Sequence, residues 1–338
     1  GPDIKISHGG ITSVLRAYSQ TFIWTKYDMA ILDPFSEKGN MRMVFAFIQA
    51  LFLFHIRSYK RQIVHVHVGG YISFLRKSVL RIISKWRRKK TILHLHNLRT
   101  IMFLSNGPEF VTPYYRWVVC RTDIVVVLSQ SMAEQLLAIC PTANIRILHN
   151  PCIVEYHGVT LYETKNPIIL FAGLICKDKG CFDLIEAFAI IHEKIPEAIL
   201  VMAGMGDIED VKIAARNYGI SDYVKCPGWI TGKELEQEFL NASIFCLPSY
   251  KEGIPMVILE AMAYGIPVVT TPVGGIPDLI ISNVNGILTP VGDVSFLAKN
   301  LLRLLFSLPL RMKLGHAGSE FVMNKYSLKS SANGLDKI

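Results

Sequence analysis

One stretch of sequence decides the fold: SYKEGIPMVILEAMAYGIPVVT, residues 249–270. Its first residues form a loop that ends at Gly253-Ile254-Pro255, and the apolar residues that follow predict a helix over 255–264. A strand over 267–270 comes next, and another strand over 243–247 precedes the stretch. A strand, a helix and a strand in this order make a βαβ unit, which predicts parallel pairing.

The same alternation of short apolar strands and longer helices continues along the chain. In the first half, strands are predicted over 63–68, 91–96, 124–128 and 145–148, and helices over 11–21, 41–57, 71–85 and 131–139. The second half repeats the pattern from residue 168 and ends in two helical stretches. We predict an α/β protein of two Rossmann-like domains, residues 1–155 and 156–338, whose parallel sheets face each other across a cleft. Residues 151–166 are the expected linker.

The two ends of the chain give two more expectations. Only residues 2–7 precede Gly9 and Gly10, where a doubly wound domain normally has its first strand. We therefore expect that the first strand of the N-terminal domain is missing from this chain. The last helix is expected to pack back on the N-terminal domain.

Composition narrows the class of protein. The chain has 338 residues, 51% of them hydrophobic, so two domains can each bury a core. Its seven cysteines are scattered and form no C-x-x-C pair, which argues against a disulfide framework and a zinc site. No signal-peptide pattern and no apolar run of about 18 to 20 residues occurs, so a cytoplasmic location is expected. The apolar run 44–56 predicts a helix that packs on a sheet or dips into a membrane surface.

Positive charge is concentrated in the N-terminal half. Residues 1–155 hold 20 Lys and Arg against 8 Asp and Glu, whereas residues 156–338 hold 16 against 19. Six of the cations surround Trp86: Arg81, Lys85, Arg87, Arg88, Lys89 and Lys90. This cluster suits anionic lipid headgroups or phosphates, and a solvated helix end fits it equally well. No nucleic-acid recognition motif accompanies the charge, so we expect no nucleic acid partner.

Two carboxylates of the quoted stretch are candidates for a binding site. Glu252 lies on the loop that leads into the helix, and Glu260 lies about two turns into it. The first turn of a helix favours anionic ligands and acidic side chains. Glu252 could be only a helix-start acid and Glu260 a solvated residue. However, Glu260 is embedded among apolar residues, where a charge needs a partner.

These residues resemble the signature of the retaining glycosyltransferases of family four, which have the GT-B fold of two Rossmann-like domains. Further segments match that family in order and spacing: Phe171-Ala-Gly-Leu-Ile-Cys-Lys-Asp-Lys-Gly180, Ala203-Gly-Met-Gly206, Pro272-Val-Gly-Gly-Ile-Pro-Asp278, Asn285-Gly286 and Ser7-His-Gly-Gly-Ile11. Singly these segments are weak signals, but together they cover most of the chain and are highly specific.

The resemblance implies a donor site held mainly by the C-terminal domain. Lys179 would neutralise the donor diphosphate, with Lys177 as a partial helper. Glu252 would orient the donor sugar and Glu260 the ribose. The backbone N–H groups of Gly9 and Gly10 and the helix N-terminus at Gly253-Ile254-Pro255 would also stabilise the diphosphate.

The sequence departs from the family pattern at one diphosphate contact. The arginine that relatives carry five positions before the lysine is Leu174 here. Lys and Arg are not interchangeable at a forked phosphate contact, so Lys177 replaces it only in part. The departure bears on both activity and donor specificity.

Three more residues are assigned by the resemblance. His96 lies at the carboxyl edge of its strand, where relatives have a histidine that faces the transferred sugar. His94 lies on the same face and is the alternative counterpart, and a purely structural role is the other reading. Gly228 and Trp229 follow a short strand over 223–226, where Trp229 either stacks on the nucleobase or packs in the core. None of the histidines, including those at 65 and 67, predicts a metal site.

The resemblance implies a retaining, metal-independent hexosyltransferase that needs no cofactor besides its nucleotide-sugar substrate, with a UDP-linked donor favoured. No Asp-x-Asp occurs, as the metal-dependent GT-A class would require. The expected acceptor is a glycan or lipid-linked intermediate of bacterial surface polysaccharide, met at the inner face of an anionic membrane. A sugar-nucleotide epimerase of GT-B fold and a non-catalytic nucleotide-sugar binder are the alternatives. An NAD-dependent dehydrogenase is disfavoured because the segment 204–206 lacks the third glycine of the dinucleotide fingerprint.

Overall fold

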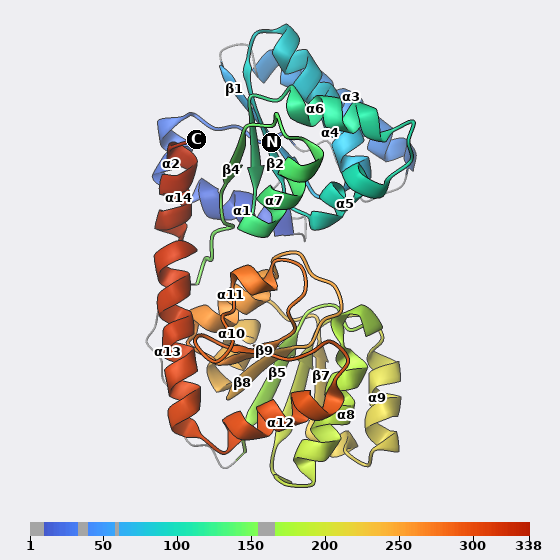
Figure 1. Ribbon diagram of the computed structural model, residues 1–338, viewed down its shortest axis with the longest axis vertical. Coiled ribbons are helices and arrows are strands. Elements are labelled where there is room, and N and C mark those ends of the chain that lie inside the picture. Colours follow the sequence, from blue (N-terminus) through green and yellow to red (C-terminus); the bar gives the residue numbers. More distant parts are fainter. Residues whose placement is uncertain (1–9, 33–39, 58–60, 155–165) are drawn as a thin grey trace. The chain divides into compact units, whose positions relative to one another are not determined.

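The computed structural model of the chain describes residues 10–32, 40–57, 61–154 and 166–338. The chain divides into two compact units (Figure 1). Unit 1 consists of Gly1–Pro151 and Leu328–Ile338, and unit 2 consists of Cys152–Ser327. Each unit contains one sheet, and the described strands of both sheets pair in parallel. The predicted α/β class with two parallel sheets is therefore confirmed.

The sheet of unit 1 has the strand order β1-β2-β3-β4. Its strands are β1 (Ile63–Val68), β2 (Lys90–Leu95), β3 (Ile124–Val127) and β4 (Ile145–Ile147). The connecting helices are α4 (Tyr71–Trp86), α5 (Leu98–Asn106), α6 (Thr112–Cys120) and α7 (Gln130–Ile139). Every connection advances in the same direction across the sheet, so right-handed crossovers place these helices on one face.

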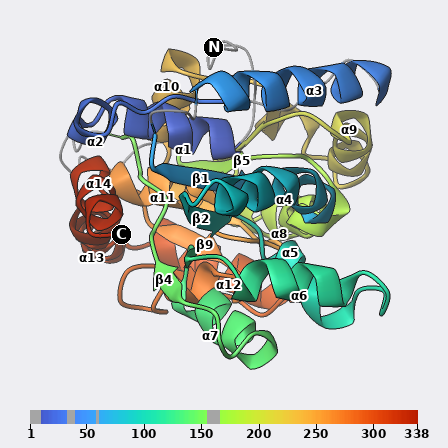
Figure 2. The ribbon, with the colours of Figure 1, turned by 90° about the horizontal axis from the view of Figure 1, so that it is seen from above.

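Helix α1 (Gly10–Ser19) covers the opposite face of this sheet (Figure 2). Its buried side chains join residues of β2, β3 and the end of β4 in one core cluster: Val14, Tyr18, Ile92, Val126 and Leu148. Two more helices, α2 (Phe22–Lys26) and α3 (Asn40–Arg57), precede β1 in the chain. Figure 2 shows α3 running over α4, and the His55 side chain of α3 contacts Arg87 at the end of α4.

The last helix of the chain, α14 (Leu328–Asp336), also belongs to unit 1. It packs against α1 and α2, and Leu335 packs on the core cluster that α1 forms. The Lys26 ammonium lies 2.7 Å from the Asp336 carboxylate. Unit 1 is therefore built from two separate segments of the chain.

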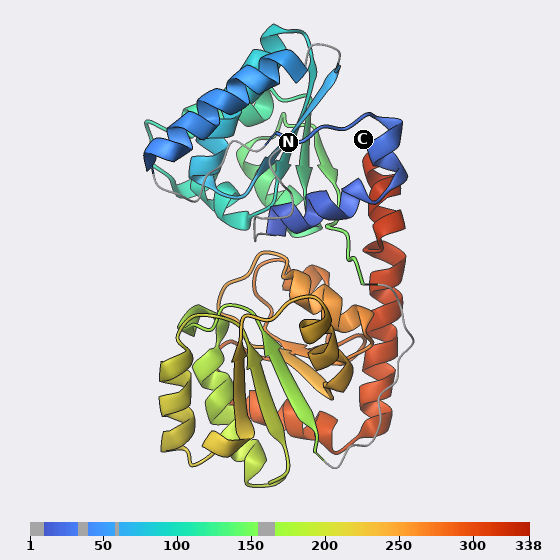
Figure 3. The same cartoon turned by 180° about the vertical axis from the view of Figure 1, so that it is seen from behind.

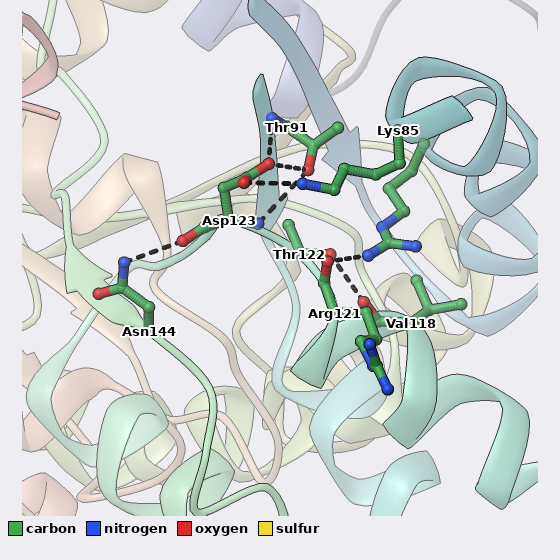
Figure 4. Close-up of polar contacts among 8 residues, drawn as sticks. Lys85, Thr91, Val118, Arg121, Thr122, Asp123 and Asn144 are labelled. Carbon is green, nitrogen blue, oxygen red and sulfur yellow. Dashed lines mark hydrogen bonds and ion pairs between the residues drawn. The ribbon is translucent and has the colours of Figure 1, made fainter. Parts of the chain in front are cut away.

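Asp123 joins three elements at the start of β3 (Figure 4). Its carboxylate lies 2.8 Å from the Lys85 ammonium of α4 and accepts hydrogen bonds from the backbone N–H and the hydroxyl of Thr91. Its backbone carbonyl accepts a hydrogen bond from the Asn144 amide. Partial burial alone would raise the pKa of Asp123, but the bonds from Lys85 and Thr91 lower it to about 2.

The sheet of unit 2 has the strand order β10-β9-β8-β5-β6-β7. Its strands are β5 (Ile168–Ala172), β6 (Ile199–Ala203), β7 (Val224–Gly228), β8 (Ile244–Leu247), β9 (Val268–Thr270) and β10 (Ile287–Leu288). Its helices are α8 (Cys181–His192), α9 (Ile208–Asn217), α10 (Lys233–Asn241), α11 (Met256–Ala263), α12 (Val294–Leu305) and α13 (Leu308–Lys325). The middle strands β5 and β8 are fully apolar, as strands covered on both faces must be.

The connections of this sheet run outward in both directions from its centre. From β5 they advance to β6 and β7, and from β8 they advance to β9. Right-handed crossovers therefore place α8 and α9 on one face and α11 on the other. Figures 1 and 3 show these two layers from opposite sides. The strand order reverses between β5 and β8, and open α/β sheets bind ligands beside the carboxyl ends of strands at such a point.

Most predicted strands lie within one or two residues of the observed ones, but several helices were not predicted. The alternation missed α2, α5, α6 and α10, and the two predicted C-terminal helical stretches are three helices, α12 to α14, in the described part of the chain. Residues 1–9 and residues 155–165 of the expected linker lie outside the described residues. Among the described residues, no helix combines the length and apolar character needed to cross a bilayer.

Candidate active site

A charged pair lies at the carboxyl edge of the unit 2 sheet. Lys179 lies in the connection from β5 to α8, and Glu252 in the connection from β8 to α11. The Lys179 ammonium is 2.5 Å from Glu252 Oε1, and the Glu252 side chain is only 6% exposed. The Ser249 hydroxyl donates to the same carboxylate oxygen at 2.8 Å. The pair therefore lies where the strand order reverses, and Ser249 is a site residue that sequence reasoning missed.

Two glycines let the loops around this pair approach closely. Gly180, directly after Lys179, has a φ of 69°, and a Cβ there would lie 2.1 Å from the Pro248 carbonyl oxygen. Gly274, in the loop after β9, has a φ of 59°, and its Cβ would lie 2.0 Å from the Glu252 carbonyl oxygen. Any larger residue at either position would force the backbones apart. Three loops from β5, β8 and β9 thus hold the pair in place.

Hydrogen bonds fix the loop that carries Glu252. The Tyr250 N–H donates to the Asp178 carbonyl at 2.8 Å, and the Tyr250 hydroxyl donates to the Asp183 carboxylate at 2.7 Å. The Thr271 hydroxyl donates to the Ser249 carbonyl. These bonds tie the loop to both neighbouring connections, so Glu252 has a defined position before any ligand binds.

The helix start and the second carboxylate follow the same loop. The Gly253 carbonyl accepts the Gly275 N–H at 2.8 Å, and the side chains of Ile254 and Pro255 are buried just before α11. Glu260 lies in the second turn of α11. Burial raises the pKa of Glu260 to about 7, so at neutral pH this carboxyl is near its titration point.

The remaining predicted donor residues of unit 2 lie in loops at the same sheet edge. Lys177 and Leu174 are exposed in the connection after β5. Trp229 follows β7 and is half exposed, so its ring is not part of the core. Gly228 has a φ of 82°, and its carbonyl accepts the Gly204 N–H at 2.8 Å, which holds the end of β7 beside that of β6.

The carboxyl edge of unit 1 carries an apolar cavity of about 560 Å³. The loop after β1, the start of α4, Asn97 after β2 and part of α5 line it, with Tyr71 and Phe103 among the aromatic residues. Gly10 begins α1, and a Cβ on Gly69 would lie 3.0 Å from the side chain of Ile11, so the start of α1 lies close to this edge. Gly9 lies outside the described residues.

Four histidines lie together on one face of this sheet. His96 Nε2 is 2.8 Å from His67 Nδ1, and the rings of His94 and His96 stack with centroids 4.1 Å apart. Burial lowers the pKa of His65 to about 4 and, with the charges of His65 and Lys77, that of His96 to about 3. Burial also holds the pKa values of His67 and His94 well below the usual range. All four imidazoles are therefore neutral at pH 7.

Some of these ring nitrogens have no partner within the part of the chain that the structure describes. They are Nε2 of His65 and both nitrogens of His94. A buried polar group without a hydrogen bond costs roughly 1–3 kcal/mol, so such groups are uncommon. Ligand atoms of His65, His67 and His94 lie within 4.8 Å of one another, although the sequence pattern was not expected to form a metal site. The signal was present in the alternation His-Val-His on one strand and His-Leu-His on the next.

The basic cluster around Trp86 is smaller on the surface than predicted. Arg81 is only 3% exposed and donates to the Arg121 carbonyl, so it is not part of an exposed patch. Lys85 is held by Asp123 (Figure 4), and Lys89 donates to the Arg61 carbonyl at 2.5 Å. The exposed residues of the cluster are Trp86, at 86%, with Lys85, Arg88 and Lys90. Arg87 is half-buried and contacts His55 of α3.

Comparison with known proteins identifies the family. Two family models match: "Glycosyltransferase Family 4" over residues 27–156 and "Glycosyl transferases group 1" over residues 155–321. The amylovoran biosynthesis glycosyltransferase AmsK of Erwinia amylovora is 32% identical over 56% of this chain and 49% of its own length. The capsular polysaccharide biosynthesis glycosyltransferase CapM of Staphylococcus aureus is 31% identical over 62% of this chain and 58% of its own length. The chain thus spans about half the length of these relatives.

Solved structures share the fold at low sequence identity. Sucrose-phosphate synthase of Thermosynechococcus elongatus has a TM-score of 0.73 at 21% identity, covering 90% of this chain and 79% of that one. Anabaena HepE in complex with UDP-glucose has a TM-score of 0.73 at 14% identity, covering 98% of this chain and 96% of that one. The two family models and the fold lead to one conclusion: this chain belongs to the group 1 glycosyltransferases and has the GT-B fold.

Proposed function

We propose that the chain is a retaining hexosyltransferase. It would move a hexose or N-acetylhexosamine from a nucleoside-diphosphate sugar, preferably UDP-linked, to a hydroxyl of a glycan or lipid-linked acceptor in bacterial surface polysaccharide synthesis. The observation that carries the proposal is the Lys179–Glu252 pair at the point where the unit 2 strand order reverses. The names of the polysaccharide relatives support the pathway, and HepE, a protein of the same fold, was solved with UDP-glucose.

The pair gives the donor a cation and a hydrogen-bond acceptor side by side. Lys179 supplies a point charge for the diphosphate, and Glu252 can accept hydrogen bonds from the hydroxyls of the sugar. Because the two side chains bind each other in the free protein, the donor must replace that contact with its own. Glu260 would accept from the ribose hydroxyls, and Trp229, half exposed, would stack on the nucleobase.

We propose front-face attack as the reaction. The bond between the anomeric carbon and the diphosphate oxygen breaks, and the acceptor oxygen bonds to that carbon on the same face. The acceptor proton passes to the departing phosphate oxygen. Lys179 and backbone N–H groups would stabilise the charge that develops on the leaving group, so no metal ion is required on the diphosphate.

The acceptor would bind in unit 1. The cavity of about 560 Å³ between β1, β2 and α5 is mostly apolar, with Asn97 as a polar contact. Such a lining suits a sugar face or the apolar part of a lipid-linked intermediate. His96 lies just beyond the end of β2, next to Asn97. The family resemblance implies that this histidine would face the transferred sugar.

Unit 1 would also meet the inner face of an anionic membrane. On α3, Ile48, Phe52 and Ile56 are spaced at helical intervals and are exposed, Phe52 at 66%. Arg87 contacts His55 and so joins the end of α3 to the end of α4, where Trp86 is exposed. An apolar stripe with a tryptophan and exposed cations beside it is typical of a helix that lies in a membrane interface.

Vesicle sedimentation tests the membrane contact. Anionic vesicles should retain the protein at low salt, and the variants Phe52→Ser and Trp86→Ser should release it. Phe306→Ser removes an equally exposed phenylalanine, 67% exposed, from unit 2 and serves as the control. Binding that is unaffected by the first two variants and by salt would refute this part of the proposal.

A thermal-shift screen tests the donor site. UDP, GDP, ADP and their common sugar conjugates are added in turn, because a ligand that binds only the folded state raises Tm. One nucleotide should give a shift that Glu260→Ala abolishes and that Glu234→Ala, an exposed acid on α10, preserves. No shift with any nucleotide would refute the donor proposal.

The retaining outcome needs a separate measurement. With the donor identified, NMR of the transferred sugar should show the anomeric configuration of the donor. The opposite configuration would exclude front-face retention, and donor binding without release of nucleoside diphosphate on any acceptor would favour the non-catalytic binder.

A further inference from the structure

Four imidazoles form a two-by-two array on the sheet of unit 1. Because side chains alternate along a strand, His65 and His67 of β1 share one face, as do His94 and His96. The register pairs His67 with His94, which brings both pairs to the same face. The ring centroids of His65 and His67 are 4.2 Å apart, and those of His67 and His94 are 5.0 Å apart.

His94 is the buried member of the array, whereas His65, His67 and His96 are partly exposed. Ile92 lies on the same face as His94, and Ile92 packs with Val14 and Tyr18 of α1. His94 is only 1% exposed. Both of its nitrogens and His65 Nε2 lack a hydrogen-bond partner anywhere in the described chain. Buried side-chain nitrogens normally have a hydrogen-bond partner or a bound ion, so we infer that these nitrogens bind a group from outside the chain.

We propose that His65, His67 and His94 bind one Zn²⁺ ion. Neutral imidazole nitrogen is a preferred zinc ligand, and three histidines with one open position are a known zinc arrangement. The candidate ligand atoms lie within 4.8 Å of one another. Tetrahedral zinc with Zn–N bonds of about 2.0–2.1 Å needs donors roughly 3.4 Å apart, so the rings must close in by about 1 Å. The planes of the His65 and His94 rings differ by only 11°, so these rings must also turn until their nitrogen lone pairs point at one ion.

The ion would position a fourth histidine. With zinc on His67 Nε2, the Nδ1–H of His67 donates to His96 Nε2, which lies 2.8 Å away. That bond places the proton of His96 on its Nδ1 and fixes the plane of the ring. His96 would therefore be oriented by the ion without being a ligand. Binding of the ion does not depend on the proposed transferase reaction.

The positive charge of Lys77 beside the array should weaken the binding of Zn²⁺. The Lys77 ammonium donates to the His67 carbonyl at 2.8 Å, and its positive charge opposes that of the ion. The ion is held by imidazole nitrogens and by no charged ligand in this set, so zinc should bind more weakly than in thiolate sites.

Metal titration of the purified full chain tests the proposal. After chelation, Zn²⁺ is added in competition with a chromophoric chelator, and Co²⁺ is added separately as a spectroscopic probe of coordination. One ion per chain is expected, with the visible absorption of low-coordinate Co²⁺. His94→Leu should weaken binding at least 100-fold, whereas His316→Ala, an exposed histidine of unit 2, should leave it unchanged.

The outcomes separate a zinc site from a purely structural array. Equal binding by the wild type and His94→Leu, or no binding by the wild type, overturns the proposal. The metal-free variants are compared by circular dichroism and Tm, so that loss of the fold is not mistaken for loss of a ligand. If His94→Leu does not fold, His65→Gln must show the same loss of binding.

Discussion

The two sheets differ in where their polar side chains lie and in whether these side chains are paired. In unit 2, Lys179 and Glu252 lie in loops beyond the strand ends, and each is the partner of the other. In unit 1, His65, His67 and His94 lie on the strands themselves, where His94 is buried and the other two are partly exposed, and nitrogens of His65 and His94 lack partners among the described residues. A parallel sheet can therefore offer polar groups either as paired charges at its edge or as neutral rings on its face.

The difference shows what each position allows chemically. Loops at a strand end can bring opposite charges together and leave one side open to solvent, so charge is retained there. On a strand face, burial removes the charge of any group that has no counter-ion. Edge positions are therefore suited to binding phosphates and sugars, and face positions are suited to metal ligation by neutral nitrogen.

The largest loss of stability should come from Gly180→Ala, which adds a side chain next to Lys179 where two backbone segments are in contact. Gly180→Ala places a Cβ 2.1 Å from a backbone oxygen at a φ of 69°, so we expect a loss of at least about 3 kcal/mol in unfolding free energy. Gly219 has nearly the same φ, 70°, with open space around it, and Gly219→Ala should cost only about 1 kcal/mol. Urea denaturation measures both. Equal losses would show that the close loop approach is not what holds the charged pair.

The next effect concerns the acid buried in α11. Because the folded state raises the pKa of Glu260 from 4.5 to about 7, it keeps a proton that the unfolded state has lost. Stability should therefore fall as pH rises from about 4.5 to 7, by about 3 kcal/mol at most. Glu260→Gln should remove that fall, making the free protein more stable than wild type at pH 8 and equal to it near pH 4. Parallel curves of unfolding free energy against pH would contradict it.

A pair of substitutions compares the two sheets directly. Lys179→Met leaves the buried Glu252 carboxylate without its counter-ion and should cost roughly 1–3 kcal/mol. His94→Leu in metal-free protein replaces two unpartnered nitrogens by an apolar side chain and should cost less than about 1 kcal/mol, or stabilise. Thermal unfolding in the presence of a chelator measures both. A larger loss from His94→Leu would reverse the comparison.

The smallest effect should be on nucleotide binding at Glu252. Glu252→Gln frees Lys179 from its ion pair, so UDP itself should bind a few-fold more tightly, at most about 1 kcal/mol. The same variant should lose its preference for the sugar conjugate over the bare nucleotide. Calorimetry with both ligands decides this, and Glu209→Gln, an acid exposed on α9, is the control. Weaker UDP binding in Glu252→Gln would mean that the pair does not compete with the diphosphate.

Sequence reasoning found the parallel sheets because periodicity carries that information directly. Strands such as 63–68 and 168–172 are uninterrupted apolar or alternating runs bounded by turn residues, and they lie where they were predicted. Length alone did not decide which helices were found, because the eight-residue α11 was predicted from its apolar run. Helix α10 was missed because it buries only Phe239 and contains few apolar residues. Helices α5 and α6 were missed because a simple alternation expects one helix between two strands, whereas two lie between β2 and β3.

The site was predictable only in part. The spacing of Glu252 and Glu260 and the Lys-Gly turn pointed to the carboxyl edge of the unit 2 sheet, but nothing in the sequence states that Lys179 and Glu252 touch. That contact depends on the adjacency of β5 and β8, strands that are separated by two others along the chain. The burial of Arg81 and the meeting of four histidines likewise depend on strand register and helix placement, which periodicity does not encode.

The discontinuity of unit 1 determines the order in which the chain can fold during synthesis. Unit 2 is an uninterrupted segment, so it can complete its core as soon as residue 327 has left the ribosome. Unit 1 must wait for α14, without which the side of its core that Leu335 covers stays open. The chain passes from unit 1 to unit 2 after Pro151 and returns after Ser327. The segments at these two boundaries are neighbours, because the Cys152 N–H donates to the Tyr326 carbonyl at 2.7 Å. The first unit to be translated is therefore the last to be finished.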